Sequence, residues 1–176
     1  MTYKDTVIFI DSGDTIIDEG TEIRDGEIVV SAETVPGACE TLKKLYDDGY
    51  KIVLVADGYY QSFKNMFIQN GIFEYFYAFV VSELLNVCKP DARMFKCALG
   101  AAGLDSCDVD KAIMIGNNLA RDIKGANEMN IASVHYKWSP RYEHTPSDES
   151  ETPRYVITEF SQIADVIKQF ENESAK

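Results

Sequence analysis

The stretch Val7-Ile8-Phe9-Ile10-Asp11-Ser12-Gly13-Asp14-Thr15 decides the fold of this chain. Four apolar residues end abruptly at a carboxylate and are followed by turn-forming residues, which is typical of a short strand buried on both faces. In an α/β sheet, ligands bind beyond the carboxyl ends of the strands. The pattern therefore favours Asp11 at the floor of a cleft, although a solvated turn after a strand explains this stretch alone equally well.

Similar apolar runs recur along the chain and alternate with amphipathic helical patterns. Further strands are expected at 28–30, 52–55, 78–81, 112–115, 131–134 and 155–157, and helices within 34–49, 59–71, 91–103, 118–130 and 158–170, with a short helical turn capped by Ser82. This alternation predicts an α/β fold of three layers, in which a mainly parallel sheet lies between helices as in Rossmann-like domains. Right-handed crossovers then bring the strand ends together.

Two polar segments interrupt this alternation. Residues 16–33 are rich in Glu and contain a hairpin signal at Asp25-Gly26, which predicts a small flap over the end of the first strand instead of a cap domain. Residues 138–154 form a polar loop, whose aromatic start is either a plain surface loop or a docking site for a protein partner. We expect residues 1–176 to form a single domain.

Composition restricts the partners and the location of the protein. The formal net charge of −12 gives a surface that repels nucleic acid and anionic membranes. No apolar run approaches the roughly 18 residues that suggest a membrane span, and a signal-peptide pattern is absent. The four cysteines lack C-x-x-C spacing, so we expect reduced, mostly buried thiols in a cytoplasmic protein. His135 and His144 are too few and too separated to suggest a metal cluster.

Four short motifs follow the strands in a fixed order. They are Asp11-x-x-x-Thr15 after the first strand, Ala56-Asp57-Gly58 after another strand, Lys89-Pro90-Asp91 before a helix, and Gly116-Asn117 with Asp122 before the next helix. Any one of these motifs is a weak signal. Their order over residues 7–134 resembles that of the haloacid dehalogenase-like hydrolases, and the small members without a large cap domain are the most similar.

The resemblance implies phosphatase chemistry with a covalent intermediate. Asp11 would be the nucleophile that attacks phosphorus, and Lys89 would neutralise the oxygens of the carboxylate and the phosphate. The family uses Mg²⁺, which here would be bound by Asp11, by the backbone carbonyl of Gly13 and by Asn117. The implied substrate is a small phosphorylated molecule.

The resemblance also implies supporting roles for the remaining motif residues. Phosphate would be bound by Lys89 and by the backbone N–H groups of Asp57 and Gly58. Thr15 matches the closing residue of the first motif, and Asp122 matches the later acid of the fourth motif.

The chain also departs from the family pattern at three positions. Gly13 stands where the family has the Asp that protonates the leaving group, Ala56 replaces a phosphate-binding hydroxyl residue, and Asn117 replaces a metal-binding Asp. Asp14 does not simply replace the missing acid, because successive side chains of an extended chain point to opposite sides. Whether Asp14 or Asp57 nevertheless supplies the proton is left open.

Three functions therefore compete. The first is a slow, Mg²⁺-dependent hydrolase of small phosphate esters, and the second is a non-catalytic binding or regulatory module with the same fold. The third is carbon–halogen or carbon–phosphorus chemistry, which suits Gly13 but not the small flap. A general acid contributes about 10²–10⁴-fold to a rate, so the loss of one acid leaves a slow enzyme, whereas the loss of all three groups removes useful turnover.

Overall fold

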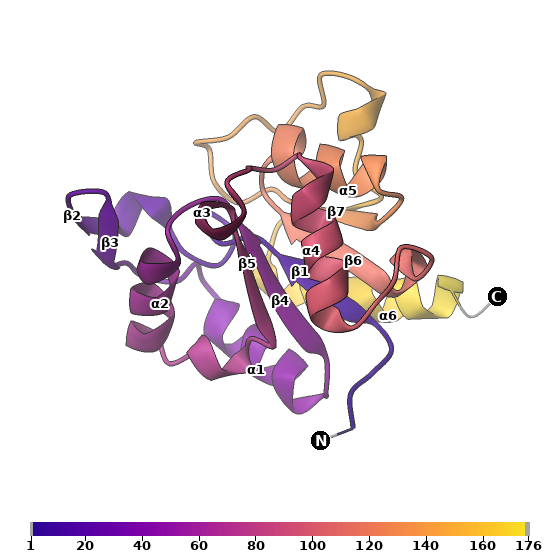
Figure 1. Cartoon of the computed structure of the whole chain (residues 1–176), viewed down its shortest axis with the longest axis horizontal. Coiled ribbons are helices and arrows are strands. Elements are labelled where there is room, and N and C mark those ends of the chain that lie inside the picture. Colours follow the sequence, from indigo (N-terminus) through magenta and orange to yellow (C-terminus); the bar gives the residue numbers. More distant parts are fainter. Residues whose placement is uncertain (1, 175–176) are drawn as a thin grey trace.

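A six-stranded sheet, parallel throughout, forms the centre of the computed structural model, which describes residues 2–174 (Figure 1). Its strands are β1 (Val7–Ile10), β4 (Lys51–Ala56), β5 (Ala78–Val81), β6 (Ala112–Gly116), β7 (Ala132–Tyr136) and β8 (Tyr155–Ile157). The order across the sheet is β5-β4-β1-β6-β7-β8. Because β1 is central, Asp11 lies in the middle of the edge that the carboxyl ends form.

Helices cover both faces of the sheet. They are α1 (Ala38–Asp47), α2 (Tyr60–Gln69), α3 (Ser82–Leu85), α4 (Ala92–Ala102), α5 (Lys124–Glu128) and α6 (Ile163–Ser174). On β1, Ile8 belongs to a core cluster with residues of α1, α2 and α6, whereas the adjacent Phe9 belongs to a second cluster with residues of α4 and α5. The predicted three-layer α/β fold is confirmed.

Short helices join these elements. They are the 3₁₀ helices η1 (Glu19–Thr21), η2 (Phe73–Tyr75), η3 (Val109–Lys111), η5 (Glu149–Glu151) and η6 (Phe160–Gln162), and the π-helical turn η4 (Leu119–Ile123). The single helix expected within 118–130 is therefore divided into η4 and α5. A π-helical turn of this kind is common beside functional sites, and here it follows Asn118, whose backbone N–H donates to Asp122.

Two other expected boundaries were wrong for local reasons. Helix α1 begins at Ala38 and not near Thr34, because Gly37 has a φ of +80°, a left-handed conformation outside the helical region. Ser82 is the first residue of α3 and does not cap it, because its hydroxyl accepts a hydrogen bond from the Gly58 N–H at 2.9 Å.

The predicted flap is an antiparallel hairpin of β2 (Ile23–Asp25) and β3 (Ile28–Ser31). It lies beside α2, at one end of the molecule in Figure 1. Side chains of α2 take the place of a third strand: Ser62 Oγ accepts the Val29 N–H and Asn65 Nδ2 donates to the Val29 carbonyl, both at 3.0 Å. The flap is therefore fixed to α2 by hydrogen bonds between α2 side chains and the flap backbone.

The cysteines differ from the expectation of mostly buried thiols. Cys39 is half-buried, and Cys88, Cys97 and Cys107 are exposed. Cys97 lies in α4 as the helical pattern over 91–103 predicts, but it is exposed, whereas the adjacent Ala98 is buried. None of the helices between residues 2 and 174 combines the length and the apolarity that crossing a bilayer requires.

Candidate active site

Three charged side chains meet at the carboxyl edge of the sheet. Lys89 Nζ donates to Asp11 Oδ1 at 2.7 Å and to Asp122 Oδ1 at 2.6 Å. Asp11 follows β1 and Asp122 lies in η4 after β6, so β1 and β6 place two carboxylates around one ammonium. The side chain of Asp122 is fully buried, whereas that of Asp11 retains 13% exposure. Asp11 is the carboxylate of the pair that a ligand can reach.

The electrostatics of this cluster keep Lys89 charged. Burial acts to lower the pKa of the Lys89 ammonium, but the negative charges of Asp11, Asp122 and Asp57 outweigh it and hold that pKa above its usual value. Burial raises the pKa of the Asp122 carboxyl, and the charge of Asp11 raises it further, against the lowering effect of Lys89. Lys89 is therefore a fixed cation beside the predicted nucleophile.

Neighbouring groups hold Lys89 and Asp122 in position. Asp57 Oδ1 accepts the backbone N–H of Lys89 at 3.0 Å, and Asp122 Oδ2 accepts the backbone N–H of Asn118 at 3.0 Å. A Cβ at Gly116 would lie 2.3 Å from Asp122 Oδ2, so the carboxylate has room only beside glycine. The Gly116-Asn117 motif thus supports the lysine indirectly, through Asp122.

The predicted phosphate-binding residues lie beside this cluster. Asp57 lines the same cavity as Asp11 and Lys89, and its Oδ2 lies 3.6 Å from Arg121 Nη1. The Gly58 N–H already donates to the hydroxyl of Ser82. Phosphate binding by Asp57 and Gly58 stays a prediction, and at Gly58 a phosphate would compete with that hydroxyl.

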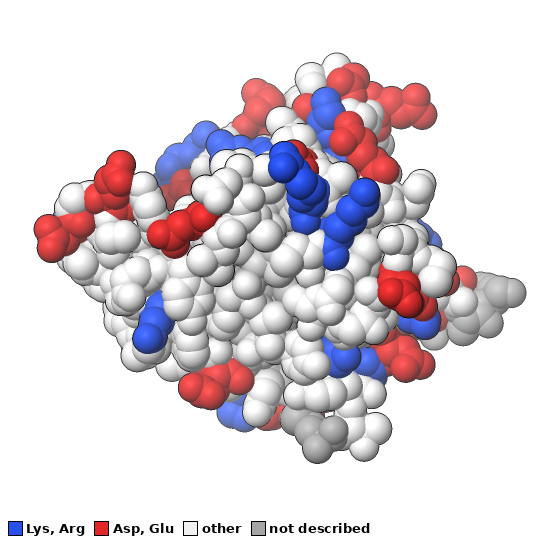
Figure 2. Space-filling model, in the orientation of Figure 1, with Lys and Arg blue, Asp and Glu red and all other residues white. Residues whose placement is uncertain are grey.

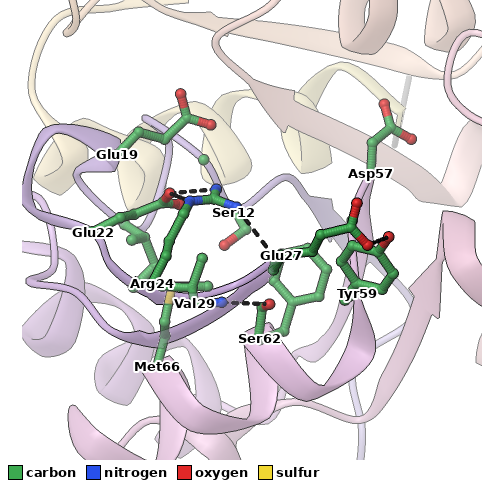
Figure 3. A pocket seen from close by; sticks show the side chains of 14 residues that line it. Ser12, Glu19, Glu22, Arg24, Glu27, Val29, Asp57, Tyr59, Ser62 and Met66 are labelled. Carbon is green, nitrogen blue, oxygen red and sulfur yellow. Dashed lines mark hydrogen bonds and ion pairs between the residues drawn. The ribbon is translucent and has the colours of Figure 1, made fainter.

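Two cavities adjoin beside the cluster of Asp11, Lys89 and Asp122. The smaller, of about 40 Å³, is lined by Asp11, Gly13, Glu19, Asp57, Lys89, Asn117, Asn118, Arg121, Asp122 and Tyr142. The larger, of about 100 Å³, lies under the flap, with Glu19 and Glu22 on one side and Asp57 and Tyr59 on the other (Figure 3). Gly13, Glu19 and Asp57 line both, so these three residues mark the junction between the cavities.

The smaller cavity suits a hard cation that keeps water. Asp11, Gly13 and Asn117 all line it, and their oxygen atoms are the kind of donor that Mg²⁺ prefers. Within residues 2–174, no three His, Cys, Asp or Glu side chains are grouped so as to hold a metal ion. Mg²⁺ usually binds to one or two carboxylates and retains several water molecules, so a site with few carboxylates suits it. A metal ion that needs all of its ligands from the protein would fit this site less well.

Two histidines lie next to the backbone of Asn117 or to each other. His135 of β7 is fully buried, and its Nε2 lies 3.2 Å from the Asn117 carbonyl and 3.4 Å from His144 Nδ1. The 138–154 loop returns His144 to β7, which brings the two rings together. Thr15 is also fully buried, in the turn where its N–H donates to the Ser12 carbonyl at 3.1 Å.

Asp14 is directed to the 138–154 loop. It has a φ of +48°, and its carboxylate accepts hydrogen bonds from Arg141 Nε at 2.7 Å, from Arg141 Nη2 and from the Glu19 N–H. Burial acts to raise the pKa of Asp14, but the bonds from Arg141, Ser139 and Glu19 outweigh it and lower that pKa. A carboxylate committed to an arginine in this way is a poor proton donor, and its role is to anchor the loop.

The space beside Gly13 is filled by Glu19, which the motif comparison missed. A Cβ at Gly13 would lie 2.1 Å from Glu19 Oε1. The Tyr142 hydroxyl donates to Glu19 Oε2 at 2.9 Å. Burial raises the pKa of the Glu19 carboxyl, and the charges of Asp14 and Asp11 raise it further against the effect of Tyr142. Glu19 belongs to the polar flap and carries no motif, so the sequence offered no signal for it.

Charge is distributed unevenly around the site. On the face drawn in Figure 2, basic side chains gather over α4, whereas acidic side chains dominate the flap and much of the rim. Arg121 lines the smaller cavity and its side chain is 50% exposed. An anion that approaches an acidic molecule therefore meets two cations at the site, Arg121 at the surface and Lys89 at the floor.

Replacement of Arg141 by Ala should lower the free energy of unfolding by about 1–3 kcal/mol, the usual penalty for a buried polar group that loses its partner. The reason is that Asp14 would stay buried without a cation, with only the Glu19 N–H and the Ser139 side chain as donors. Urea unfolding measures the change. Lys43→Ala removes an exposed pair with Asp47 and should change stability by no more than about 0.5 kcal/mol. Equal losses in both variants would contradict this role for Arg141.

Comparison with known proteins shows the family. Residues 15–136 match the family described as haloacid dehalogenase-like hydrolase. The glyceraldehyde 3-phosphate phosphatase of Pyrococcus furiosus is 32% identical over 142 residues, 81% of this chain and 57% of that protein. The pyrimidine 5′-nucleotidase PynA of Streptococcus pneumoniae is 27% identical over 136 residues, 77% of this chain and 54% of that protein.

A solved structure of another protein has a similar fold. An uncharacterized protein from Listeria monocytogenes serotype 4b aligns with a TM-score of 0.73 over 95% of this chain and 99% of that chain, at 22% sequence identity. The chain spans about half the length of the curated relatives that it matches. The match to the family over residues 15–136 and the shared fold identify the chain as a member of the haloacid dehalogenase-like hydrolases.

Proposed function

We propose that this protein hydrolyses small phosphate esters, with Asp11 as the nucleophile. The observation that carries the proposal is the contact of 2.7 Å between Lys89 Nζ and Asp11 Oδ1 at the floor of a cavity. A partly exposed carboxylate beside a fixed cation is suited to attack a phosphate, because the cation offsets the repulsion between two anions. The names of the two curated relatives, a phosphatase and a nucleotidase, support the same class of substrate.

The proposed reaction has two steps. In the first, an oxygen of Asp11 attacks phosphorus, the bond between phosphorus and the leaving oxygen breaks, and the leaving oxygen takes a proton. In the second, a water oxygen attacks phosphorus, the bond to Asp11 breaks, and inorganic phosphate leaves while the water gives up a proton. Lys89 neutralises charge in both steps, and Asp122 holds the Lys89 ammonium in place by accepting a second hydrogen bond from it.

Magnesium would be held by Asp11, by the carbonyl of Gly13 and by the side-chain oxygen of Asn117. When bound, the ion supplies positive charge that stabilises the phosphoryl oxygens. The phosphate would also contact the N–H groups near Asp57 and Gly58, and Thr15 would support the turn that carries Asp11. We propose that all of these groups belong to one domain.

Removal of divalent metal should abolish the activity. With excess Mg²⁺, we expect slow release of phosphate from an activated aryl phosphate, whose leaving group depends least on a general acid. EDTA should reduce the rate by at least about 10²-fold, since a catalytic metal contributes several kcal/mol of charge stabilisation. Added Mg²⁺ should restore the rate, and the assay measures inorganic phosphate against a protein-free blank.

The alternatives give different results in the same assay. No release above the blank with Mg²⁺ present would contradict the proposed activity and favour a non-catalytic module. Release of halide from a haloacid, without release of phosphate from any ester, would favour carbon–halogen chemistry.

A further inference from the structure

We infer that Glu19 is the general acid and base of this site, in the position that Gly13 leaves open. Glu19 would give a proton to the leaving oxygen in the first step and take one from water in the second. This inference rests on the proposed function, and it assigns a catalytic role to a residue outside every motif of the chain.

The first argument is the space that Glu19 fills. Gly13 has no side chain, and a Cβ placed there would lie 2.1 Å from Glu19 Oε1 and 2.9 Å from its carboxyl carbon. The carboxylate of Glu19 therefore lies where a side chain at residue 13 would begin. It reaches this point from η1, the first turn of the flap, and Figure 3 shows it apart from the ion pair of Arg24 and Glu22.

The second argument is the way Glu19 is held. Its backbone N–H donates to Asp14 Oδ1 at 3.0 Å, and Asp14 is itself paired with Arg141. Tyr142 donates to Oε2 at 2.9 Å, which leaves Oε1 as the oxygen against Gly13. The flap and the 138–154 loop thus fix both the backbone and the carboxylate of Glu19. Such support from neighbouring groups is what a catalytic side chain needs to keep its geometry.

The third argument is the position of Glu19 between the two cavities. The smaller cavity holds Asp11 and Lys89, and the larger one lies under the flap, where a leaving group has room. Of the three residues that line both cavities, Gly13 has no side chain. Asp57 uses Oδ1 to accept the backbone N–H of Lys89, and its Oδ2 is paired with Arg121 Nη1 at 3.6 Å. Glu19 Oε1 faces Gly13 and has no arginine beside it in this way, so Glu19 is the better placed side chain at this junction for proton transfer.

The proton balance of the two steps then closes within the site. In the first step the carboxylic acid of Glu19 gives its proton to the leaving oxygen as the ester bond to phosphorus breaks, and Asp11 becomes an aspartyl phosphate. In the second step the Glu19 carboxylate takes a proton from the attacking water as the bond from phosphorus to Asp11 breaks. Asp11 and Glu19 return to their starting forms, and the products are an alcohol and inorganic phosphate.

The test is Glu19→Gln, assayed on two esters with different leaving groups. Gln keeps the shape of the side chain and can still accept the hydrogen bond from Tyr142, but it cannot supply a proton. We expect kcat/KM, which reports the first step and not the hydrolysis of the aspartyl phosphate, to fall by about 10²–10⁴-fold for an alkyl phosphate, the usual contribution of a general acid. For a nitrophenyl phosphate, whose leaving group needs no proton, the fall should be much smaller. Glu33→Gln, an exposed change in the same flap that lines neither cavity, should leave both rates unchanged.

A second variant exchanges the two positions. Gly13→Asp in a Glu19→Ala background places a carboxylate at residue 13 and removes the group with which it would collide. This double variant should recover at least about 10-fold of the alkyl phosphatase activity that Glu19→Ala loses, as expected for the return of a general acid. Gly13→Asp alone, which forces two carboxylates into one space, should be no more active than the wild type and should unfold at a lower urea concentration than the double variant.

The outcomes separate this inference from the proposed function. If the wild type hydrolyses both esters and Glu19→Gln matches it, the role of Glu19 is wrong and the proposed function stands. Equal losses on the two esters would assign Glu19 a positioning role and would also overturn the inference. If neither ester is hydrolysed by the wild type, both proposals fail together.

Discussion

Asp11→Asn should reduce phosphate release by about 10³-fold or more while leaving the fold as stable as the wild type, because loss of a covalent nucleophile removes the pathway itself. Its amide is a poor nucleophile, but its oxygen can still accept from Lys89 Nζ. Lys89 also keeps its bond of 2.6 Å to Asp122, so one cation and one anion stay paired in the buried cluster. A large loss of activity with no loss of stability is therefore the result expected at the nucleophile.

Two measurements check the nucleophile. Phosphate release gives the loss of rate, and mass spectrometry of acid-quenched protein should show a phosphoryl adduct on the wild type but none on Asp11→Asn. Asp110→Asn is the control, because Asp110 is exposed and lies in η3, just before the opposite end of β6. A variant at Asp11 with a rate near that of the wild type would exclude this residue as the nucleophile.

Lys89→Met should damage both activity and stability. Met has a similar length, but it leaves the carboxylates of Asp11 and Asp122 together without a cation. Removal of one partner from a buried ion pair lowers stability by about 3–5 kcal/mol, and the loss of the charge beside the nucleophile should reduce the rate by at least about 10²-fold. Urea unfolding and phosphate release measure the two effects. Lys111→Met, which breaks an exposed pair with Asp108, should change neither by a comparable amount.

A double variant tests the origin of that instability. Lys89→Met with Asp122→Asn removes the second buried charge, and the Asn oxygen can still accept the N–H of Asn118. The double variant should be more stable than Lys89→Met alone, although it stays inactive. If the losses of unfolding free energy in Lys89→Met and Asp122→Asn simply add up in the double variant, the charges of the cluster do not act as a unit.

The fold was predictable because the sheet is buried on both faces. Each parallel strand is a short, continuous apolar run, and each helix has one apolar side, so the order of elements is visible in the sequence. The errors lie where a single side chain changes a local boundary. Ser82 uses its hydroxyl for Gly58 and not for a helix end, and the carboxylate of Asp122 accepts the Asn118 N–H within η4.

The candidate site was predictable only where motifs mark it. Asp11, Lys89 and Asp122 follow strands or precede helices, and the topology brings their side chains into contact. Glu19 and Tyr142 meet across more than a hundred residues from two polar segments, which have no periodicity and no fixed spacing. Contacts of this kind depend on how loops fold over the sheet, and hydrophobic patterns carry no information about them.

The central place of β1 has a consequence for synthesis of the protein. Among the strands of this sheet β1 is synthesised first, yet one of its neighbours, β6, begins at Ala112. Until that segment has emerged, one edge of an apolar strand has no partner, and such edges readily pair with other chains. The nascent chain is thus most exposed to aggregation during translation, and a premature stop before β6 would yield an insoluble product and not a smaller working domain.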